Sequence, residues 1–494
     1  MQKIVKLGIT LVAAVTAVGL AEPVAGATSH GDGPPWPTSN SSIGGAVTES
    51  AIFAREQVFQ QLADQNNGIR AAGEPGYAAA VKYVEKSLES SGLDPREQSF
   101  SFPYFKELSP PLLTQVAPSP ATYPASTFDY SGSADVTGAV VPTTNIDSST
   151  SGCAVSDFPP IVGTAPEVAL IKRGTCTFGD KILNAAAAGY AAAIVYNDGL
   201  PGRTGVVSAT IGKAVAIPAI GTDYDSGAAM LAAARSGGST VRVATRTINQ
   251  TRQTVNVIAD TPGGDPNHVL VVNEQLDALP SGPGIVENAS GVSTALEIAY
   301  QIHRLHLTPK YKIRFIFYGA EATRARQDPN GELVAQLGSY HYVHSLSAKQ
   351  LGKIFAAVDI HSIAAPNYGR FVFTGGPDGS DKVENVFTNY FSSVGLPTEE
   401  SIDFVAGQAD FGPMADAGVP IGGLFGGSNS PKTAEEAALF GGVADELYDA
   451  CFHDACDSIS NVNRQAQAEF AAAAWNGIWT LATTDQGLFT ASQG

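Results

Sequence analysis

Apolar positions between residues 47 and 91 recur at steps of three and four, as in Ile52, Val58 and Leu62. This period predicts helices with one buried face. The next stretch, 96–105, has the composition of a strand, and residues 108–124 are rich in Pro and Ser. We therefore expect the chain to open with helices and to cross a domain boundary within 108–124.

Short strand-like runs fill the segment from about 127 to 246. "ADVTGAVVPT" at 134–143 and "EVALIKRG" at 167–174 are examples, and an Ala-rich stretch around Lys181 to Tyr190 predicts one helix between such runs. This change of pattern indicates a compact, β-rich insert.

Beyond residue 247, buried-strand runs alternate with helical patterns. The strand runs are 254–260, 268–276, 311–321, 354–362, 369–376 and 419–427, and the helical ones are 291–305, 338–346, 382–394 and 467–483. Alternation of this kind predicts an α/β fold, a three-layer sandwich with a mostly parallel central sheet. Ligand sites in such folds lie at the carboxyl ends of the strands.

Five acidic residues stand at or after these strand ends: Asp277, Glu287, Glu321, Asp359 and Asp410. Grouped carboxylates share protons, bind a cation or repel one another, so the pattern indicates hard-cation binding or acid–base catalysis. The alternative is that they are solvated loop acids and helix caps.

The formal charge of −18 over 494 residues and the pI near 4.8 argue against nucleic acid as a partner, which requires clustered Lys and Arg. Such acidity also fits a soluble protein outside the cell.

The first residues have the pattern of a signal peptide. Lys3 and Lys6 precede an apolar run from Leu7 to Leu20, and "AGA" at 25–27 is a small-residue cleavage site. We expect residues 1–27 to be removed, 28–42 to form a loose arm, and the mature protein to be secreted without a membrane anchor.

Four cysteines in an exported chain predict two disulfides, for which three pairings exist. Their spacing favours Cys153 with Cys176 and Cys451 with Cys456, because each pair falls within one local segment. A zinc site is the competing interpretation, but the close CxxC pairs typical of such sites are missing.

The segment "IKRGTCTFGDKILNAAAAGYAAAIVYND", residues 171–198, resembles the core of the protease-associated (PA) domain. The resemblance implies a small β-sandwich-like domain inserted as a lid or protein-contact surface, which we place at 127–246.

The passages "SGPGIVENASGVSTALEIA", "IRFIFYGAE", "AGVPIGGLFGG" and "LYDACFHDACDSISNVN" resemble the M28 family of zinc aminopeptidases. The resemblance runs from about residue 46 to 484 around the insert, so the peptidase-like domain takes 43–126 and 247–494. It implies an α/β sandwich whose pocket holds two zinc ions and accepts a free peptide N-terminus.

When the family's motifs are compared with this sequence position by position, several of the metal-ligand positions carry other residues. Gln275 stands where the family has a zinc-binding His, Glu287 replaces the bridging Asp, and Ala322 takes the position of a ligand Glu. Phe411, after Asp410 in "ADF", takes that of a ligand His. Asp277, the general-base position Glu321 and the ligand position Asp359 are kept.

Ala322 and Phe411 offer no donor atom and a Gln amide is a poor zinc ligand, so the sequence predicts either no cofactor or one weakly held divalent cation. A new ligand is His361, which strand alternation places on the same face as Asp359; the alternative is a hydrogen-bonded structural His. The insertion at 322–337 offers Asp328 or Glu332.

Three functions follow from this site. The first is a secreted pseudo-peptidase that binds peptide N-termini or another ligand without zinc hydrolysis. The second is an active metallo-aminopeptidase with a rebuilt metal site. The third is an adhesion or regulatory protein whose PA domain makes the contacts with a peptide or protein partner. The oligomeric state is left open.

Overall fold

The fold is known from a computed structural model, which describes residues 45–322, 326–327, 333–334, 336–401 and 410–489. The predicted signal peptide and arm, together with Asp328 and Glu332, lie outside these residues. In the described part of the chain, no helix is long and apolar enough to cross a membrane.

The peptidase-like part is built on a central sheet whose middle strands are parallel. β9 (Asp265–Gln275) lies between β10 (Tyr311–Tyr318) and β13 (Ile354–His361), and β16 (Ile421–Phe425) follows β13. β14 (Phe371–Phe373) is antiparallel to β16, and β15 (Glu399–Ser401) is parallel to β14. The predicted mostly parallel sheet is confirmed.

Alternate side chains of each central strand face two different helical layers. On β9, Leu270 and Val272 pack into one apolar core, and Val269 and Val271 pack into the other. One layer contains α1 (Glu49–Asp64), α2 (Pro75–Ser90), α5 (Ser290–Arg304), α8 (Ser380–Ser393) and α11 (Arg464–Thr483). The other contains α6 (Leu337–Ser345), α9 (Gly412–Asp416) and α10 (Ala434–Phe440), with α7 (Ala348–Leu351) beside α6 in sequence. Burial on both faces explains the near-continuous apolar strand runs.

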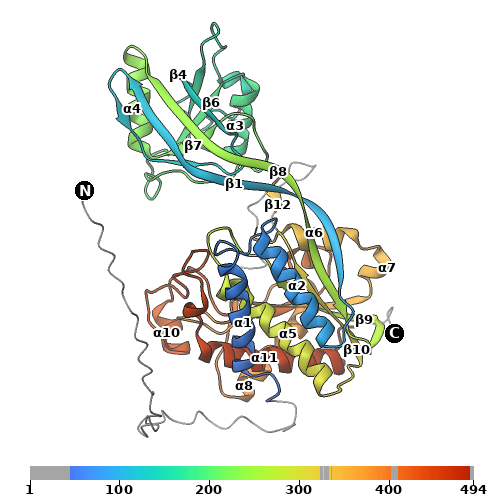
Figure 1. The fold of residues 1–494 in the computed structure, drawn as a ribbon. Helices are drawn as coiled ribbons and strands as arrows, with labels where there is room; N and C mark the ends of the chain where they lie inside the picture. The colour runs from blue at the N-terminus through green and yellow to red at the C-terminus, as the bar shows by residue number, and fades with distance from the viewer. Residues whose placement is uncertain (1–44, 323–325, 328–332, 335, 402–409, 490–494) are drawn as a thin grey trace, which may run out of the picture. The chain divides into compact units, whose positions relative to one another are not determined.

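The strands that lead into and out of the insert are long and paired. β1 (Arg96–Ala117) and β8 (Thr240–Asp260) form one antiparallel ribbon, seen in Figure 1 as the blue and green strands. Residues 108–117 of the expected boundary segment are therefore part of a continuous strand. The ladder tolerates Pro110 and Pro111 because its register shifts between Ser109 and Leu112, and prolines are accepted at such irregularities.

The insert contains more regular structure than its sequence pattern predicted. β4 (Ala134–Pro142), β5 (Glu167–Lys172), β6 (Ala192–Tyr196) and β7 (Ala219–Thr222) are parallel neighbours, and β3 (Ala125–Thr127) adds to β7, with β2 (Ala121–Thr122) on β1. The predicted helix is α3 (Phe178–Ala187), and a second, α4 (Tyr224–Ser236), was not predicted. The apolar residues of α4 are mostly Ala, so the hydrophobic period that marks a helix in the sequence is weak there.

Both predicted disulfides are present. Cys153 is bonded to Cys176 within the insert, and Cys451 is bonded to Cys456 in the peptidase-like part. A short antiparallel pair, β11 (Arg326–Gln327) with β12 (Leu333–Val334), lies in the insertion after Ala322.

Candidate active site

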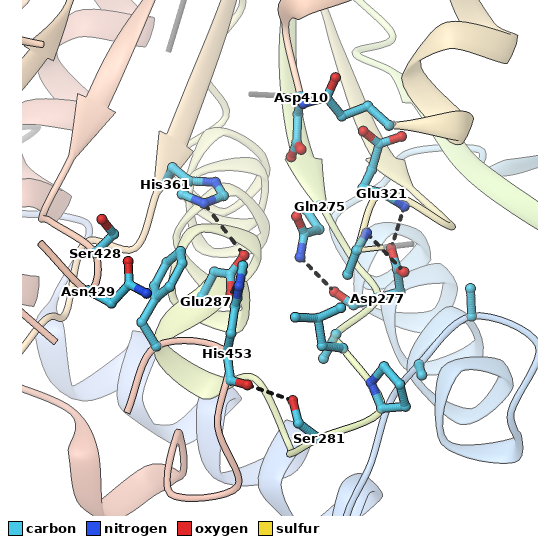
Figure 2. A pocket seen from close by; sticks show the side chains of 18 of the residues that line it. Gln275, Asp277, Ser281, Glu287, Glu321, His361, Asp410, Ser428, Asn429 and His453 are labelled. Carbon is cyan, nitrogen blue, oxygen red and sulfur yellow. Dashed lines mark hydrogen bonds and ion pairs between the residues drawn. The ribbon is translucent and has the colours of Figure 1, made fainter. Parts of the chain in front are cut away.

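Four of the five acids at the strand ends line one cavity, as the family resemblance implied, and the fifth, Asp359, is buried and is not among the lining residues. Gln275, Asp277, Glu287, Glu321, Ala322 and Asp410 all line it, together with His361 and His453 (Figure 2). Most come from the ends of β9, β10 and β13 or the segments that follow β9 and β10, whereas Asp410 precedes α9 and His453 follows α10 in the chain. The predicted location at the carboxyl edge of the sheet is thus where the structure has its cavity.

The loop that follows β9 is held by a buried arginine. The Arg70 guanidinium donates to the backbone oxygens of Leu276, Pro283 and Gly284 at 2.7, 2.8 and 2.6 Å. Burial lowers the pKa of Arg70 to about 10, so the group still carries its charge at neutral pH. Arg70 therefore fixes both ends of the segment between Gln275 and Glu287.

Asp277 ties the end of β9 to the end of β10. Its carboxylate accepts hydrogen bonds from the backbone N–H groups of Glu321 (2.9 Å) and Ala322 (3.2 Å). Burial raises the pKa of Asp277 to about 7. The Gln275 side-chain amide donates to the backbone oxygen of Asp277 at 3.1 Å. Asp277 thus positions backbone here, rather than orienting an imidazole.

Glu321, at the general-base position, is fully engaged by one neighbour. Its Oε1 accepts from the backbone N–H of Ser339 at 2.6 Å, and its Oε2 accepts from the Ser339 hydroxyl at 2.9 Å. Burial raises the pKa of the Glu321 carboxyl well above its usual range. A general base must be deprotonated and within reach of the proton that it removes. In this structure Glu321 is held as a buried, hydrogen-bonded carboxyl group.

Glu287 faces two imidazoles across the cavity. His453 Nε2 lies 2.8 Å from Glu287 Oε2, and His361 Nε2 lies 3.9 Å from Glu287 Oε1 (Figure 2). Asp457 fixes the backbone of Glu287, because its carboxylate accepts hydrogen bonds from the N–H groups of Val286 and Glu287 at 2.7 and 3.1 Å.

His453 is a site residue that our sequence analysis missed. It lies in the loop closed by the disulfide between Cys451 and Cys456, and its backbone oxygen accepts from Ser281 Oγ at 2.7 Å. The signal was available in "CFHDAC", since a histidine between bonded cysteines sits in a constrained loop. No strand or helix period marks it, so only the fold brings it to Glu287.

Phe411 does not line the cavity, which corrects its placement among the pocket residues. Its ring is buried in the apolar core on one face of the sheet and contacts Phe373 edge-to-face at 4.9 Å between ring centroids. The physical reason is that an aromatic ring at this position gains more from burial than from facing a polar cavity. The neighbouring Asp410 lines the cavity instead.

Asp359 and His361 lie on the same face of β13, as strand alternation predicted. With Asp410 they form a buried group whose candidate donor atoms all lie within 4.8 Å of one another. Burial raises the pKa of Asp359 to about 8 and lowers that of His361. Burial, followed by the neighbouring Asp359, raises the pKa of Asp410. The imidazole is therefore neutral at neutral pH and able to coordinate a cation.

Comparison with known proteins places these features in a family. Residues 256–478 match peptidase family M28, and residues 136–230 match the PA domain. An aminopeptidase of Pseudomonas aeruginosa (strain UCBPP-PA14) is 35% identical over 437 residues, which cover 84% of this chain and 78% of that protein. The probable lipoprotein aminopeptidase LpqL of Mycobacterium tuberculosis is 33% identical over 442 residues, 85% and 82% of the two chains.

Solved structures show the same fold at lower identity. The aminopeptidase from Aneurinibacillus sp. strain AM-1 aligns with a TM-score of 0.68 and 22% identity, covering 90% of this chain and 97% of that one. BSAP, a zinc aminopeptidase from Bacillus subtilis, aligns with a TM-score of 0.62 and 18% identity, covering 91% and 99%. The chain therefore belongs to peptidase family M28 and carries an inserted PA domain.

Proposed function

We propose that this chain binds the free N-terminus of a peptide in the acidic cavity and does not carry out the two-zinc hydrolysis of its family. The observation that carries the proposal is Ala322, a side chain without a donor atom, held at the cavity wall by the bond between its N–H and Asp277.

The residues present do not fit two zinc ions. Zinc is bound by thiolate, imidazole and carboxylate. The chain offers an amide at Gln275, the last residue of β9, and a methyl group at Ala322, after β10, and the amide donates its hydrogen bond to the Asp277 backbone oxygen. The carboxylate and imidazoles of Glu287, His361 and His453 stand together elsewhere in the cavity.

The engagement of Glu321 supports the same conclusion. Both oxygens of the Glu321 carboxyl group accept hydrogen bonds from Ser339, which occupies the atoms that would take a proton from water. Hydrolysis in this scheme also needs a cation that activates the water. The chain keeps the general-base residue, but the arrangement around it supports binding rather than turnover.

Glu287 is the acceptor that we assign to the peptide's ammonium group. Its side chain lines the cavity, and its partner His453 has a side chain that is 45% exposed, so a ligand can replace this contact from the open side. A buried carboxylate binds an ammonium group by a charge-assisted hydrogen bond. Acetylation of the peptide N-terminus removes that charge.

Calorimetric titration of the secreted form with a short peptide, free or N-acetylated, tests the proposal. We expect binding of the free peptide only, and a loss of about tenfold or more in affinity for Glu287→Gln. The exposed Glu89→Gln on α2 is the matched control and should bind as the original does. Zinc-stimulated release of an N-terminal residue, measured with an aminoacyl anilide, would overturn the proposal.

A second candidate is an aminopeptidase that works with a rebuilt metal site. The observation that favours it is the group Asp359, His361 and Asp410, which supplies donors that replace those lost. The same anilide assay, run with Mn²⁺, Zn²⁺ and Mg²⁺ after chelator treatment, separates the two candidates. Turnover with any of these ions supports the second.

We also propose that the protein acts outside the cell. Two disulfides support an oxidising compartment, since such bonds are rare in the cytosol. Detection of the processed chain in culture medium, beginning near Thr28, tests this; retention of the full chain in cells speaks against it.

A further inference from the structure

We propose that Asp359, His361 and Asp410 hold one first-row divalent cation at the carboxyl end of β13. This site goes beyond the proposed peptide binding, and it differs from the family's two-zinc arrangement because His361 and Asp410 replace donors that the chain has lost. One carboxylate position, Asp359, is shared with that arrangement.

The three side chains converge although they come from two separate parts of the chain. Asp359 and His361 project from the same face of β13, and Asp410 lies two residues before α9. All three are buried, and their candidate ligand atoms lie within 4.8 Å of one another. Donors bound to one cation at about 2.0–2.2 Å fall within this separation.

Several buried polar atoms without a well-formed hydrogen bond lie at the end of β13 and on the adjacent strand β9. Within the described part of the chain, both carboxylate oxygens of Asp359 and one oxygen of Asp410 have no such partner, and all are buried. The amide of Asn273, which lies beside Asp359 on β9, has neither oxygen nor nitrogen satisfied. Buried polar groups are nearly always paired, so this concentration of unpaired oxygens indicates a missing positive charge.

The charges of the neighbours point the same way. Asp359 and Asp410 are two buried carboxylates whose oxygens lie within 4.8 Å of one another. Among residues 45–322, 336–401 and 410–489, no Lys or Arg forms an ion pair with either carboxylate. A cation would neutralise both carboxylates and satisfy their oxygens together.

The donor set selects the class of ion. Two carboxylates, one imidazole and the nearby Asn273 carbonyl make an oxygen-rich site with a single nitrogen, which suits Mn²⁺ and still accepts Zn²⁺. Mg²⁺ usually retains several waters and uses carboxylates without imidazole. Mn²⁺ is therefore the probe of choice, and its paramagnetism allows direct counting of free ion.

The test is an Mn²⁺ titration of the secreted form after chelator treatment, followed by electron paramagnetic resonance of the free ion. We expect one ion per chain. His361→Gln and Asp410→Asn should each weaken binding by about tenfold or more, while the exposed Asp378→Asn should bind as the original does. Thermal melting without metal checks folding, and Asp410→Asn is isosteric and removes a repulsion.

Two outcomes would overturn the proposal. One is the absence of stoichiometric Mn²⁺ or Zn²⁺ binding by the original protein. The other is binding that is lost in Glu287→Gln but unchanged in both His361→Gln and Asp410→Asn, which would place the ion with Glu287 and His453. Neither result depends on peptide binding, so failure here is separate from failure of the proposed function.

Discussion

At the scale of single residues, the cavity is decided by what Ala322 and Gln275 lack and by what the histidines add. Ala322 is held in place by Asp277, so its side-chain position is fixed even though it offers no donor. His361 and His453 flank Glu287 instead. The imidazoles that line this cavity therefore lie beside Glu287.

Restoring the missing donors should restore zinc binding at the original place. In the double variant Gln275→His with Ala322→Glu, an imidazole and a carboxylate join Glu287 and Asp359, which are donors of the kind zinc prefers. We expect more zinc per chain than in the original, measured by elemental mass spectrometry after dialysis. Ala322→Gln alone, equal in size but a weak ligand, is the control. Equal zinc in all three proteins would contradict this reading of the site.

The buried carboxyls predict a distinctive pH dependence of stability. Burial raises the pKa of Asp277 from 3.8 to about 7, so the folded state binds this proton more tightly than the unfolded chain. The stabilisation is complete below the unfolded pKa and is lost as pH rises through 7, by an amount on the order of 4 kcal/mol.

Urea unfolding from pH 4 to pH 8, with chelator present, measures this effect. Asp277→Asn should flatten the decline in unfolding free energy relative to the original protein, because the amide does not titrate. The comparison isolates Asp277 from His361, whose pKa burial lowers and whose stability contribution runs in the opposite direction. A decline of the same slope in both proteins would assign it to other groups.

At the scale of elements, the site depends on how the loop after β9 is held. Arg70, which lies between α1 and α2, reaches three backbone oxygens of the segment 276–284, and Asp457 holds the turn that carries Glu287. These contacts join parts of the chain about 200 positions apart. The shape of the cavity wall therefore depends on tertiary contacts.

Removing Arg70 should destabilise the protein and loosen this loop. Arg70→Ala leaves three buried oxygens unsatisfied, which costs on the order of 3 kcal/mol or more. We expect a lower urea midpoint and faster hydrogen exchange in residues 276–287, with Lys86→Ala, on the exposed side of α2, as control. Unchanged exchange in this segment would show that the loop is held by other contacts.

At the scale of the whole molecule, two sets of apolar cores occupy different parts of the chain. The cores of the peptidase-like part draw on residues before 105 and after 247, whereas Leu113 and the strands β4 to β7 build those of the PA domain. The ribbon of β1 and β8 runs through both.

The peptidase-like part should fold without the insert. Deleting residues 110–244 and closing the ribbon with an Asn-Gly turn keeps the paired ends of β1 and β8 and every residue of its two main cores. We expect a cooperative melt and retained Mn²⁺ binding. A chain that does not melt cooperatively would show that the PA domain is needed for folding. Deletion of 250–494 is the reciprocal variant.

The sequence by itself determined the fold class, the family and the edge of the sheet where the site lies, because strand and helix periods and strand-end acids are local patterns. It also predicted both disulfides and the shared face of Asp359 and His361. It did not predict the second helix of the insert or the continuity of β1 past its prolines, where tertiary pairing overrides local signals.

Only the tertiary structure decided which side chains meet. It turned Phe411 into the core, brought His453 to Glu287, paired Glu321 with Ser339 and set Asp410 beside Asp359. No helical or strand period in the sequence predicts these contacts. They depend on loops whose paths are fixed by long-range packing and by buried groups such as Arg70. The arrangement of side chains in this cavity therefore depends on contacts between residues that are far apart in the sequence and that no local pattern connects.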